Sequence, residues 1–257
     1  MFASSIQPGI VSLFSSTSSE PLSTFSSHAD ASLPSDSFIH LLDDRSSQPP
    51  PLPPAAMVRP HNSEDIHEGY CIDQTVLHMQ SPTLTKTFIH CPSLHDSPAK
   101  DLALKHPWIY FQVRNLGKPW SFEIGIVDLT GTKGILRCST FQKQPHLKLP
   151  DSPSSLPILH LPLSFPLAST RPLTAWSTVS IHIPTFVPHF CSSALAGLME
   201  DDENDMPSAS RSRLPNGSYS HMTYVRVYAT CRLRRIWSSE GGPNQKLPWE
   251  FELYASE

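Results

Sequence analysis

The sequence predicts an all-β fold, an antiparallel β-sandwich or jelly roll. Short segments in which hydrophobic and polar residues alternate recur along the chain, as in strands that bury one face. The stretches NLGKP, DLTGTKG and EGGPN separate some of them and supply the Gly, Asn, Asp and Pro of tight turns. No long amphipathic helical period is present. Many short strands at fairly regular spacing are typical of sandwiches and jelly rolls.

Nine segments are the predicted strands. In chain order they are residues 72–79, 85–91, 108–113, 120–127, 133–141, 156–161, 176–183, 224–233 and 249–254. In the fourth of these, Trp120 and Phe122 share one face with Ile124 and Ile126, opposite a more polar face. Successive side chains of a strand point to opposite sides of its sheet, so Trp120 and Phe122 are expected in the core.

The predicted domain is a single sandwich formed by residues 1–25 and 70–257. Two segments interrupt it: residues 26–69 are rich in Ser, Pro and Asp, and residues 192–220 combine an acidic run with serines. Both compositions are typical of disordered inserts. The PPPLPP run at 49–54 favours polyproline II, which suits either an SH3 or WW ligand or a stiff linker.

The formal net charge of -4 is unevenly distributed. Residues 27–69 and 200–205 together hold 12 of the 23 acidic residues but only two of the 19 basic ones, so the rest of the chain carries a net charge of +6. A basic body is expected to attract acidic partners.

The stretch YVRVYATCRLRRIW near the end of the chain contains the candidate partner-binding residues. Its alternation predicts one long strand with Val225, Val227, Ala229, Cys231 and Leu233 facing the core. The opposite face would be basic and aromatic, with candidate residues Tyr224, Arg226, Tyr228, Arg232, Arg234 and Arg235. Such a face is either simply solvated or a docking surface for an acidic protein or a nucleic acid.

Motifs that carry chemistry are absent from the sequence. It contains no GxSxG, P-loop, HExxH or GxGxxG, so no catalytic or cofactor-binding residue is predicted. Neither the 13 histidines nor the acidic run at 200–205 has the spacing of a zinc or calcium site, so no metal is expected. The five cysteines form no CxxC pair and read as reduced thiols, with Cys138 and Cys231 in the core.

Targeting signals are also absent from the sequence. No apolar run reaches the roughly 18 residues of a membrane span, and the first residues lack the basic start of a signal peptide. No membrane or small-molecule partner is therefore expected, and the predicted location is cytoplasmic, nuclear or cytoskeletal.

Several segments together resemble the cilia- and flagella-associated protein 20 family, which is defined by the CFA20 domain. The resemblance covers residues 1–25 and about 70–257, less the second insert. It rests on these positions: Met1, Phe2, Gln7, Gly9, Ser12, Ser16, Ser19, Pro21 and Leu22; Cys91 and Pro92; Arg137, Ser139 and Gln142 within ILRCSTFQ; Trp176; YVRVYATCRLRRIW; and LPWEFELY at 247–254. The chain departs from the family pattern in its two inserts and in Phe25, where a tryptophan is usual.

The resemblance implies a sandwich similar to carbohydrate-binding modules and a non-enzymatic structural role in the axoneme. It implies binding to tubulin, at the inner junction of doublet microtubules, and to neighbouring inner-junction proteins, in support of cilium or flagellum assembly and motility. The implied locations are the axoneme, the cytoskeleton and the centriole or basal body. The alternatives are a nuclear, nucleic-acid-associated role and a general scaffold module.

Overall fold

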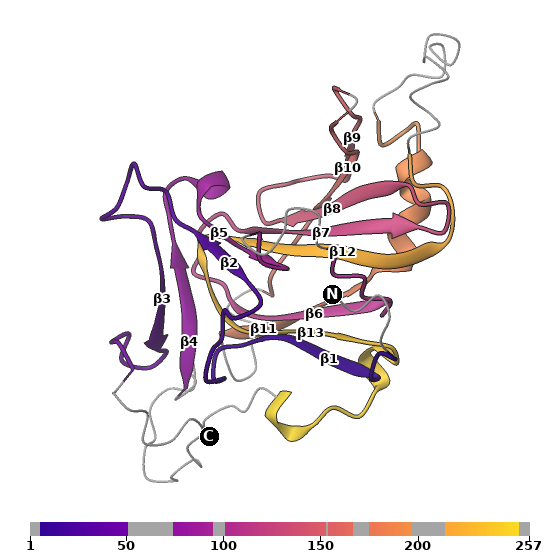
Figure 1. Ribbon diagram of the computed structural model, residues 1–257. Coiled ribbons are helices and arrows are strands. Elements are labelled where there is room, and N and C mark those ends of the chain that lie inside the picture. The colour runs from indigo at the N-terminus through magenta and orange to yellow at the C-terminus, as the bar shows by residue number, and fades with distance from the viewer. Residues whose placement is uncertain are drawn as a thin grey trace.

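The computed structural model describes residues 6–50, 74–94, 101–152, 154–166, 175–196 and 214–251. Two sheets pack face to face, which confirms the predicted β-sandwich (Figure 1). Sheet A has the order β11 (Trp176–His182), β6 (Trp108–Arg114), β13 (Cys231–Ser239), β4 (Thr75–Gln80) and β3 (Phe38–Asp43), and β1 (Ile10–Ser15) also pairs with β13. Sheet B has the order β2 (Ser26–His28), β5 (Phe88–Cys91), β12 (Tyr219–Tyr228), β7 (Ser121–Asp128), β8 (Lys133–Ser139), β10 (Ile158–Pro162) and β9 (His146–Lys148).

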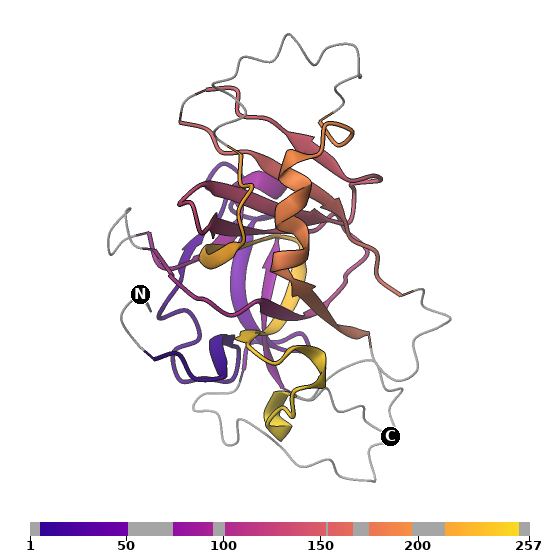
Figure 2. The ribbon, with the colours of Figure 1, turned by 90° about the vertical axis from the view of Figure 1, so that its right-hand side faces the viewer.

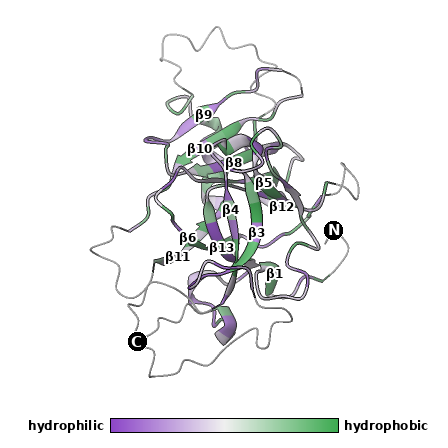
Figure 3. Ribbon diagram, turned by 90° about the vertical axis from the view of Figure 1, so that its left-hand side faces the viewer, coloured by the Kyte–Doolittle hydropathy of each residue, from purple (hydrophilic) through white to green (hydrophobic). Residues whose placement is uncertain are grey.

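One strand pair departs from the predicted antiparallel arrangement. β10 runs parallel to β8 and antiparallel to β9, whereas the other pairs of described strands are antiparallel. After β8 the chain runs in the opposite direction as β9 at the sheet edge. It then turns back as β10, which lies between β8 and β9. β9 is thereby one edge strand of sheet B, and β2 is the other; Figure 3 shows β9, β10 and β8 in this spatial order.

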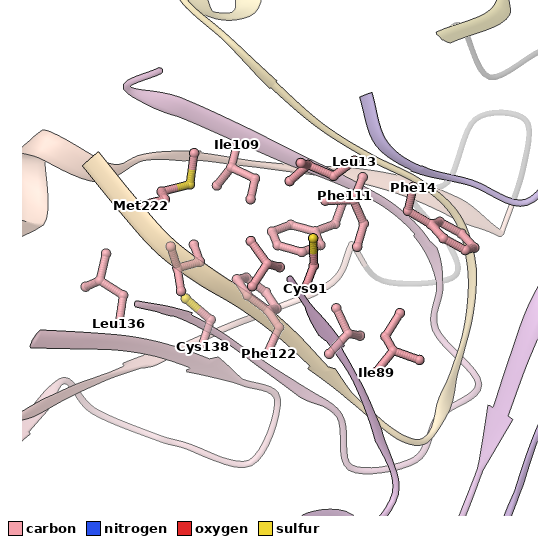
Figure 4. Close-up of a cluster of buried hydrophobic side chains, with 14 of the residues drawn as sticks. Leu13, Phe14, Ile89, Cys91, Ile109, Phe111, Phe122, Leu136, Cys138 and Met222 are labelled. Carbon is pink, nitrogen blue, oxygen red and sulfur yellow. The ribbon is translucent and has the colours of Figure 1, made fainter. Parts of the chain in front are cut away.

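The core lies between the two sheets and is built from their inward-facing side chains (Figure 4). Phe111 of β6 meets Phe122 of β7 across the interface, with ring centroids 4.3 Å apart. Trp120 and Phe122 are buried, as predicted, and so are Cys138 and Cys231. Burial of each large apolar side chain contributes roughly 1.5–3 kcal/mol, which makes this interface the main source of stability.

A nine-residue 3-10 helix that the sequence pattern did not predict, η3 (Ile183–Cys191), closes one end of the sandwich (Figure 2). Its buried residues are Ile183, Val187 and Phe190. Phe190 lies so close to Gly134 of β8 that a Cβ on the glycine would be 2.8 Å from the phenyl ring. The other described 3-10 helices are single turns: η1 (Leu84–Lys86), η5 (Gly242–Asn244) and η6 (Trp249–Phe251). No helix among the described residues is long and apolar enough to cross a membrane.

The expectation that residues 26–69 are disordered is wrong for residues 26–50. β2 and β3 lie in this segment, and the apolar residues of β3 contribute to the core. The polar composition misled because the acids are hydrogen-bonded within the fold: the Asp30 carboxylate accepts from Ser32 and, at 2.7 Å, from the Thr83 hydroxyl. Residues 51–69 of this predicted insert lie outside the described residues.

The second predicted insert, residues 192–220, is described only at its two ends. Leu214 is buried and β12 already begins at Tyr219, so residues 214–220 belong to the folded domain. Residues 197–213 lie outside the described part of the chain. The predicted C-terminal strand at 249–254 is also wrong where it is described, because residues Trp249–Phe251 form the helical turn η6.

Candidate interaction faces

The six predicted partner-binding residues lie on two opposite outer faces. The predicted strand at 224–233 is in fact the end of β12 in sheet B and the start of β13 in sheet A, joined through Ala229 and Thr230. Figure 1 shows β12 and β13 in different layers. The alternation was interpreted correctly within each strand, since its apolar residues face the core from both sides. The outward residues therefore point away from each other across the molecule.

The prediction of one continuous exposed basic face is wrong. The outer face of sheet B receives Tyr224, Arg226 and Tyr228, whereas β13 places its three arginines on sheet A. Tyr228, Arg232, Arg234 and Arg235 are all buried. Only Tyr224 and Arg226 of the six are partly exposed.

One row of polar residues crosses all seven strands of sheet B on its outer face. The strand registers place the following residues side by side, in spatial order: Ser26, His90, Arg226, Glu123, Arg137, His160 and His146. We call these seven residues the polar row. Only one of its members is acidic, and two are arginines.

Glu123 is the centre of the polar row. Its side chain is 2% exposed, and its Oε1 accepts hydrogen bonds from Arg137 Nε at 2.8 Å and from the Tyr228 hydroxyl at 3.0 Å. Its Oε2 accepts from the Tyr224 hydroxyl at 3.3 Å and lies 3.8 Å from Arg226 Nη1. One carboxylate thus orients two guanidinium groups and two phenols. The arginine side chains remain 33% and 28% exposed, for Arg137 and Arg226 respectively, and face solvent.

Aromatic rings surround Arg226 on this face. Its guanidinium carbon lies 4.7 Å from the centre of the Phe88 ring and 5.7 Å from that of Tyr224. Tyr224 in turn stacks on His90 with ring centroids 5.0 Å apart. Cation–π contacts of this kind hold a guanidinium in place without consuming its hydrogen-bond donors.

Ionisation on this face follows from the burial of the row. Burial raises the pKa of the Tyr224 and Tyr228 phenols, and the Glu123 carboxylate adds to the effect, so both hydroxyls stay protonated and donate to Glu123. Burial would lower the pKa of Arg226, but its bond to the Tyr228 hydroxyl and its proximity to Glu123 raise it. Arg226 is therefore charged at any physiological pH.

Histidines lie on both sides of the arginines in the polar row: His90 on one side, and His160 and His146 on the other. Burial lowers the pKa of His90, and Arg226 lowers it further. Burial also lowers the pKa of His160, with contributions from Arg137 and His146; its Nε2 lies 2.7 Å from the Ser139 hydroxyl. With both pKa values below the usual 6.5, these two rings are neutral near pH 7. The positive charge of the face at that pH therefore comes from the arginines.

The outer face of sheet A contains a second cluster built on one carboxylate. The buried Asp44 accepts from Arg232 Nη1 at 2.6 Å, from Arg114 Nη1 at 3.1 Å and from the Trp176 indole at 3.0 Å. We call these four residues the Asp44 cluster. The sequence reasoning missed Asp44 because it assigned the segment to a disordered insert. It missed Glu123 although one signal was available: Glu123 lies on the polar side of a strand whose other side is apolar.

Arg234 has internal hydrogen-bond partners of its own on sheet A. It is 3% exposed and donates to the side-chain oxygens of Gln74 and Gln112, both at 2.8 Å, and to the Glu250 carbonyl at 3.2 Å. Together with the Asp44 cluster, this arrangement shows that Arg232 and Arg234 tie strands and the C-terminal segment together. Their role in this structure is to hold the fold.

The described residues contain no group of three or more His, Cys, Asp or Glu side chains that could hold a metal ion. His90 and Cys91 are adjacent on β5 and point to opposite sides of sheet B: the His90 ring lies on the outer face and Cys91 lies in the core. A metal could not be bound by both of them. Cys191 lies at the end of η3 and is exposed.

The fold and these faces define a β-sandwich domain whose candidate site is the outer surface of a sheet. The comparisons agree with the resemblance seen in the sequence: a family model described as the CFA20 domain matches residues 65–187. The chain is 24% identical over 187 residues to cilia- and flagella-associated protein 20 of Chlamydomonas reinhardtii, a match that covers 71% of this chain and 75% of that protein. The namesake proteins of Caenorhabditis elegans and Paramecium tetraurelia are 24% and 21% identical over 71% of this chain, and the matches cover 70% and 75% of those proteins. These matches confirm the resemblance.

Proposed function

We propose that this chain is a non-enzymatic structural protein of the axoneme that binds microtubules, at the doublet inner junction, through the outer face of sheet B. The names of its relatives support the association with cilia and flagella. The observation that carries the binding site is the imbalance of the polar row, in which two partly exposed arginines share a single buried carboxylate.

The chemistry of this face suits an acidic protein lattice such as tubulin. Guanidinium groups pair with carboxylates through planar forks, and the aromatic rings around Arg226 provide rigid contact area. Glu123 fixes both forks before a partner arrives, so less conformational entropy is lost on binding. The exposed Lys133 of β8, which has the same outward parity as Arg137, adds positive charge beside the row.

The test is co-sedimentation with polymerised microtubules. The variant Glu123→Gln/Arg137→Gln/Arg226→Gln removes the charge imbalance without leaving an unpaired carboxylate, and it should weaken binding about tenfold or more. Lys105→Gln/Lys118→Gln is the control, because it removes two exposed positive charges from loops outside the row. Wild-type binding should also weaken as salt rises, because the attraction is screened within roughly 8 Å at physiological ionic strength.

Equal pelleting of the triple variant and the wild type, with both folded, would contradict the proposed site. Salt-sensitive binding to RNA or DNA without microtubule binding would instead favour the nuclear role. A fluorescent fusion tests location separately: signal is expected along the axoneme and at the basal body.

A further inference from the structure

Arg235 differs from its neighbours on β13 because its guanidinium has no hydrogen-bond or ion-pair partner among the described residues. Its side chain is buried, with the residue 8% exposed, and its Nε is fully buried without a hydrogen bond. The adjacent Arg234 is equally buried but donates to two glutamines and a carbonyl. A buried cation without a partner is costly, so its presence calls for a physical reason.

A β-bulge places Arg235 on the outer face of sheet A. Leu233 pairs with Val113 and Arg235 pairs with Gln112, so Arg234 is the extra residue between them. Without the bulge, strict alternation after Leu233 would turn Arg235 toward the core. Bulges commonly redirect a side chain in this way. The register with β6 therefore skips Arg234, and the consecutive residues Arg234 and Arg235 both lie on the outer face of sheet A.

Phe251 determines which edge of the Arg235 guanidinium is available. The guanidinium carbon lies 4.9 Å from the centre of the Phe251 ring, which covers one of its faces. Phe251 is held in turn by an edge contact with Trp237, at 5.2 Å between centroids, and by the Gln112 amide, which donates to its carbonyl. Nη1 and Nη2 are not among the fully buried nitrogens that lack a partner, unlike Nε. Solvent therefore reaches the guanidinium at its terminal edge.

That terminal edge is the end-on fork of the arginine, with two parallel N–H groups in one plane. A planar carboxylate matches this fork with two hydrogen bonds. Phosphate fits less well, because its greater charge needs several cations, and the nearby Arg232 and Arg234 already donate to internal acceptors. Glu250 is close enough to raise the pKa of Arg235, against the larger lowering by burial, but it forms no ion pair with it among the described residues.

We propose that Arg235 is a docking anchor that receives one carboxylate, an Asp or Glu side chain of an acidic protein partner, on the outer face of sheet A. The site is separate from the polar row, which lies on the opposite outer face, so it goes beyond the proposed function and can be tested independently. The unpaired charge is unfavourable in the free protein and becomes paired in the complex.

The test compares Arg235→Met with Arg234→Met in the full-length chain. Methionine preserves the length and packing of the stem, and an apolar replacement of a buried charge is often neutral or stabilising. Arg235→Met should therefore melt at the wild-type temperature or above. Arg234→Met should melt lower, because it leaves the buried Gln112 side-chain oxygen without its donor and also removes the bond to Gln74. A higher or equal melting temperature combined with lost binding is a result that a purely structural arginine would not give.

Binding is measured by fluorescence anisotropy with a labelled deca-glutamate peptide. Arg235→Met should raise the Kd about tenfold, and Arg235→Lys, which keeps the charge but loses the fork, should have a smaller effect. The same tenfold change is expected in the background of the triple polar-row variant. A tenfold loss of peptide affinity in that background supports the Arg235 site even if the proposed microtubule-binding site is disproved.

Two results would overturn the proposal. The first is an unchanged Kd for a folded Arg235→Met variant. The second concerns the double substitution Glu252→Gln/Glu257→Gln. If it lowers the melting temperature in the wild-type background but not in the Arg235→Met background, the carboxylate that pairs with Arg235 belongs to this chain and not to a partner.

Discussion

Tyr224 lies across Gly125, its cross-strand partner on β7, so closely that a Cβ on the glycine would be 2.3 Å from Cδ1 of the ring. The hydroxyl of Thr223 would be equally close to that Cβ. Only a residue without a side chain lets the ring lie over the sheet, where it stacks on His90 and donates to Glu123. Gly125 is therefore a requirement of the candidate site and not only of the strand.

Replacing Gly125 by alanine should destabilise the protein by about 1–3 kcal/mol, because Tyr224 and Thr223 must both move. Urea denaturation measures the change. Gly9→Ala is the matched control: the nearest atom to its Cβ is Gln245 Nε2 at 3.6 Å, an ordinary contact, so little change is expected. If Gly125→Ala were as stable as Gly9→Ala, the close approach of Tyr224 would not be a constraint.

Alternation in the sequence was sufficient to predict most strands and their inward faces. It could not predict that β12 and β13 belong to different sheets. The pattern runs from Tyr224 to Leu233 without a Gly, a Pro or a change of period, so nothing local marks the crossing at Ala229 and Thr230. Sheet membership depends on pairing with distant strands: β12 pairs with β5 and β7, and β13 pairs with β1, β4 and β6. The candidate face was divided for this reason alone.

Composition was a poor guide to the segment that holds Asp44. Serine and aspartate are frequent there, but their side chains form turns; Asp43, for example, accepts from the Ser46 amide at 2.7 Å. Asp44 then pairs with Arg232, 188 residues away in sequence. A contact of that range leaves no local signal. Part of the acidity that was assigned to disordered segments is thus inside the fold, and it neutralises Arg232, which had been predicted to face a partner.

Truncation of Phe122 should be severe. The side chain is fully buried between the sheets and contacts both Phe111 and Trp120, with centroids at 4.3 and 5.3 Å. Phe122→Ala should cost roughly 3–5 kcal/mol, because it removes apolar contact and leaves a cavity. Denaturant titration or, if the variant does not fold, the yield of soluble protein measures this. The exposed Phe141 provides the comparison, since Phe141→Ala should cost less than about 1 kcal/mol.

Glu123→Gln tests whether one carboxylate organises the polar row. The change leaves Arg137 and Arg226 close together without their shared counter-charge, and it should cost about 2–3 kcal/mol, at the low end for buried pairs because both arginines reach solvent. Adding Arg137→Gln should recover part of this loss, because one of the two unpaired charges is then removed. If the stability lost by Glu123→Gln/Arg137→Gln equals the sum of the losses in the two single variants, the two side chains act independently.

Asp128 should make stability depend on acid pH. Burial would raise the pKa of its carboxyl, but hydrogen bonds from the Thr130 hydroxyl and from the backbone amides of Gly217, Thr132 and Asn216 outweigh that effect and hold it at about 2, below the usual 3.8. The native state therefore keeps this carboxylate charged at pH values where the unfolded chain protonates it. Its contribution to stability is fully present above about pH 4 and is lost as the pH falls toward 2.

Asp128→Asn should consequently be less stable than the wild type by about 1–2 kcal/mol at pH 6, and the gap should narrow between pH 4 and pH 2. The reason for the narrowing is that protonation of the wild-type carboxyl makes the two side chains alike in charge. Urea denaturation at a series of pH values measures the gap. Asp36→Asn removes an exposed carboxylate that, among the described residues, accepts only a weak 3.4 Å bond from the Ser35 hydroxyl, so its stability should follow that of the wild type at every pH. If the difference in unfolding free energy between Asp128→Asn and the wild type stayed constant down to pH 2, the destabilisation would come from the lost hydrogen-bond geometry and not from the charge of the carboxylate.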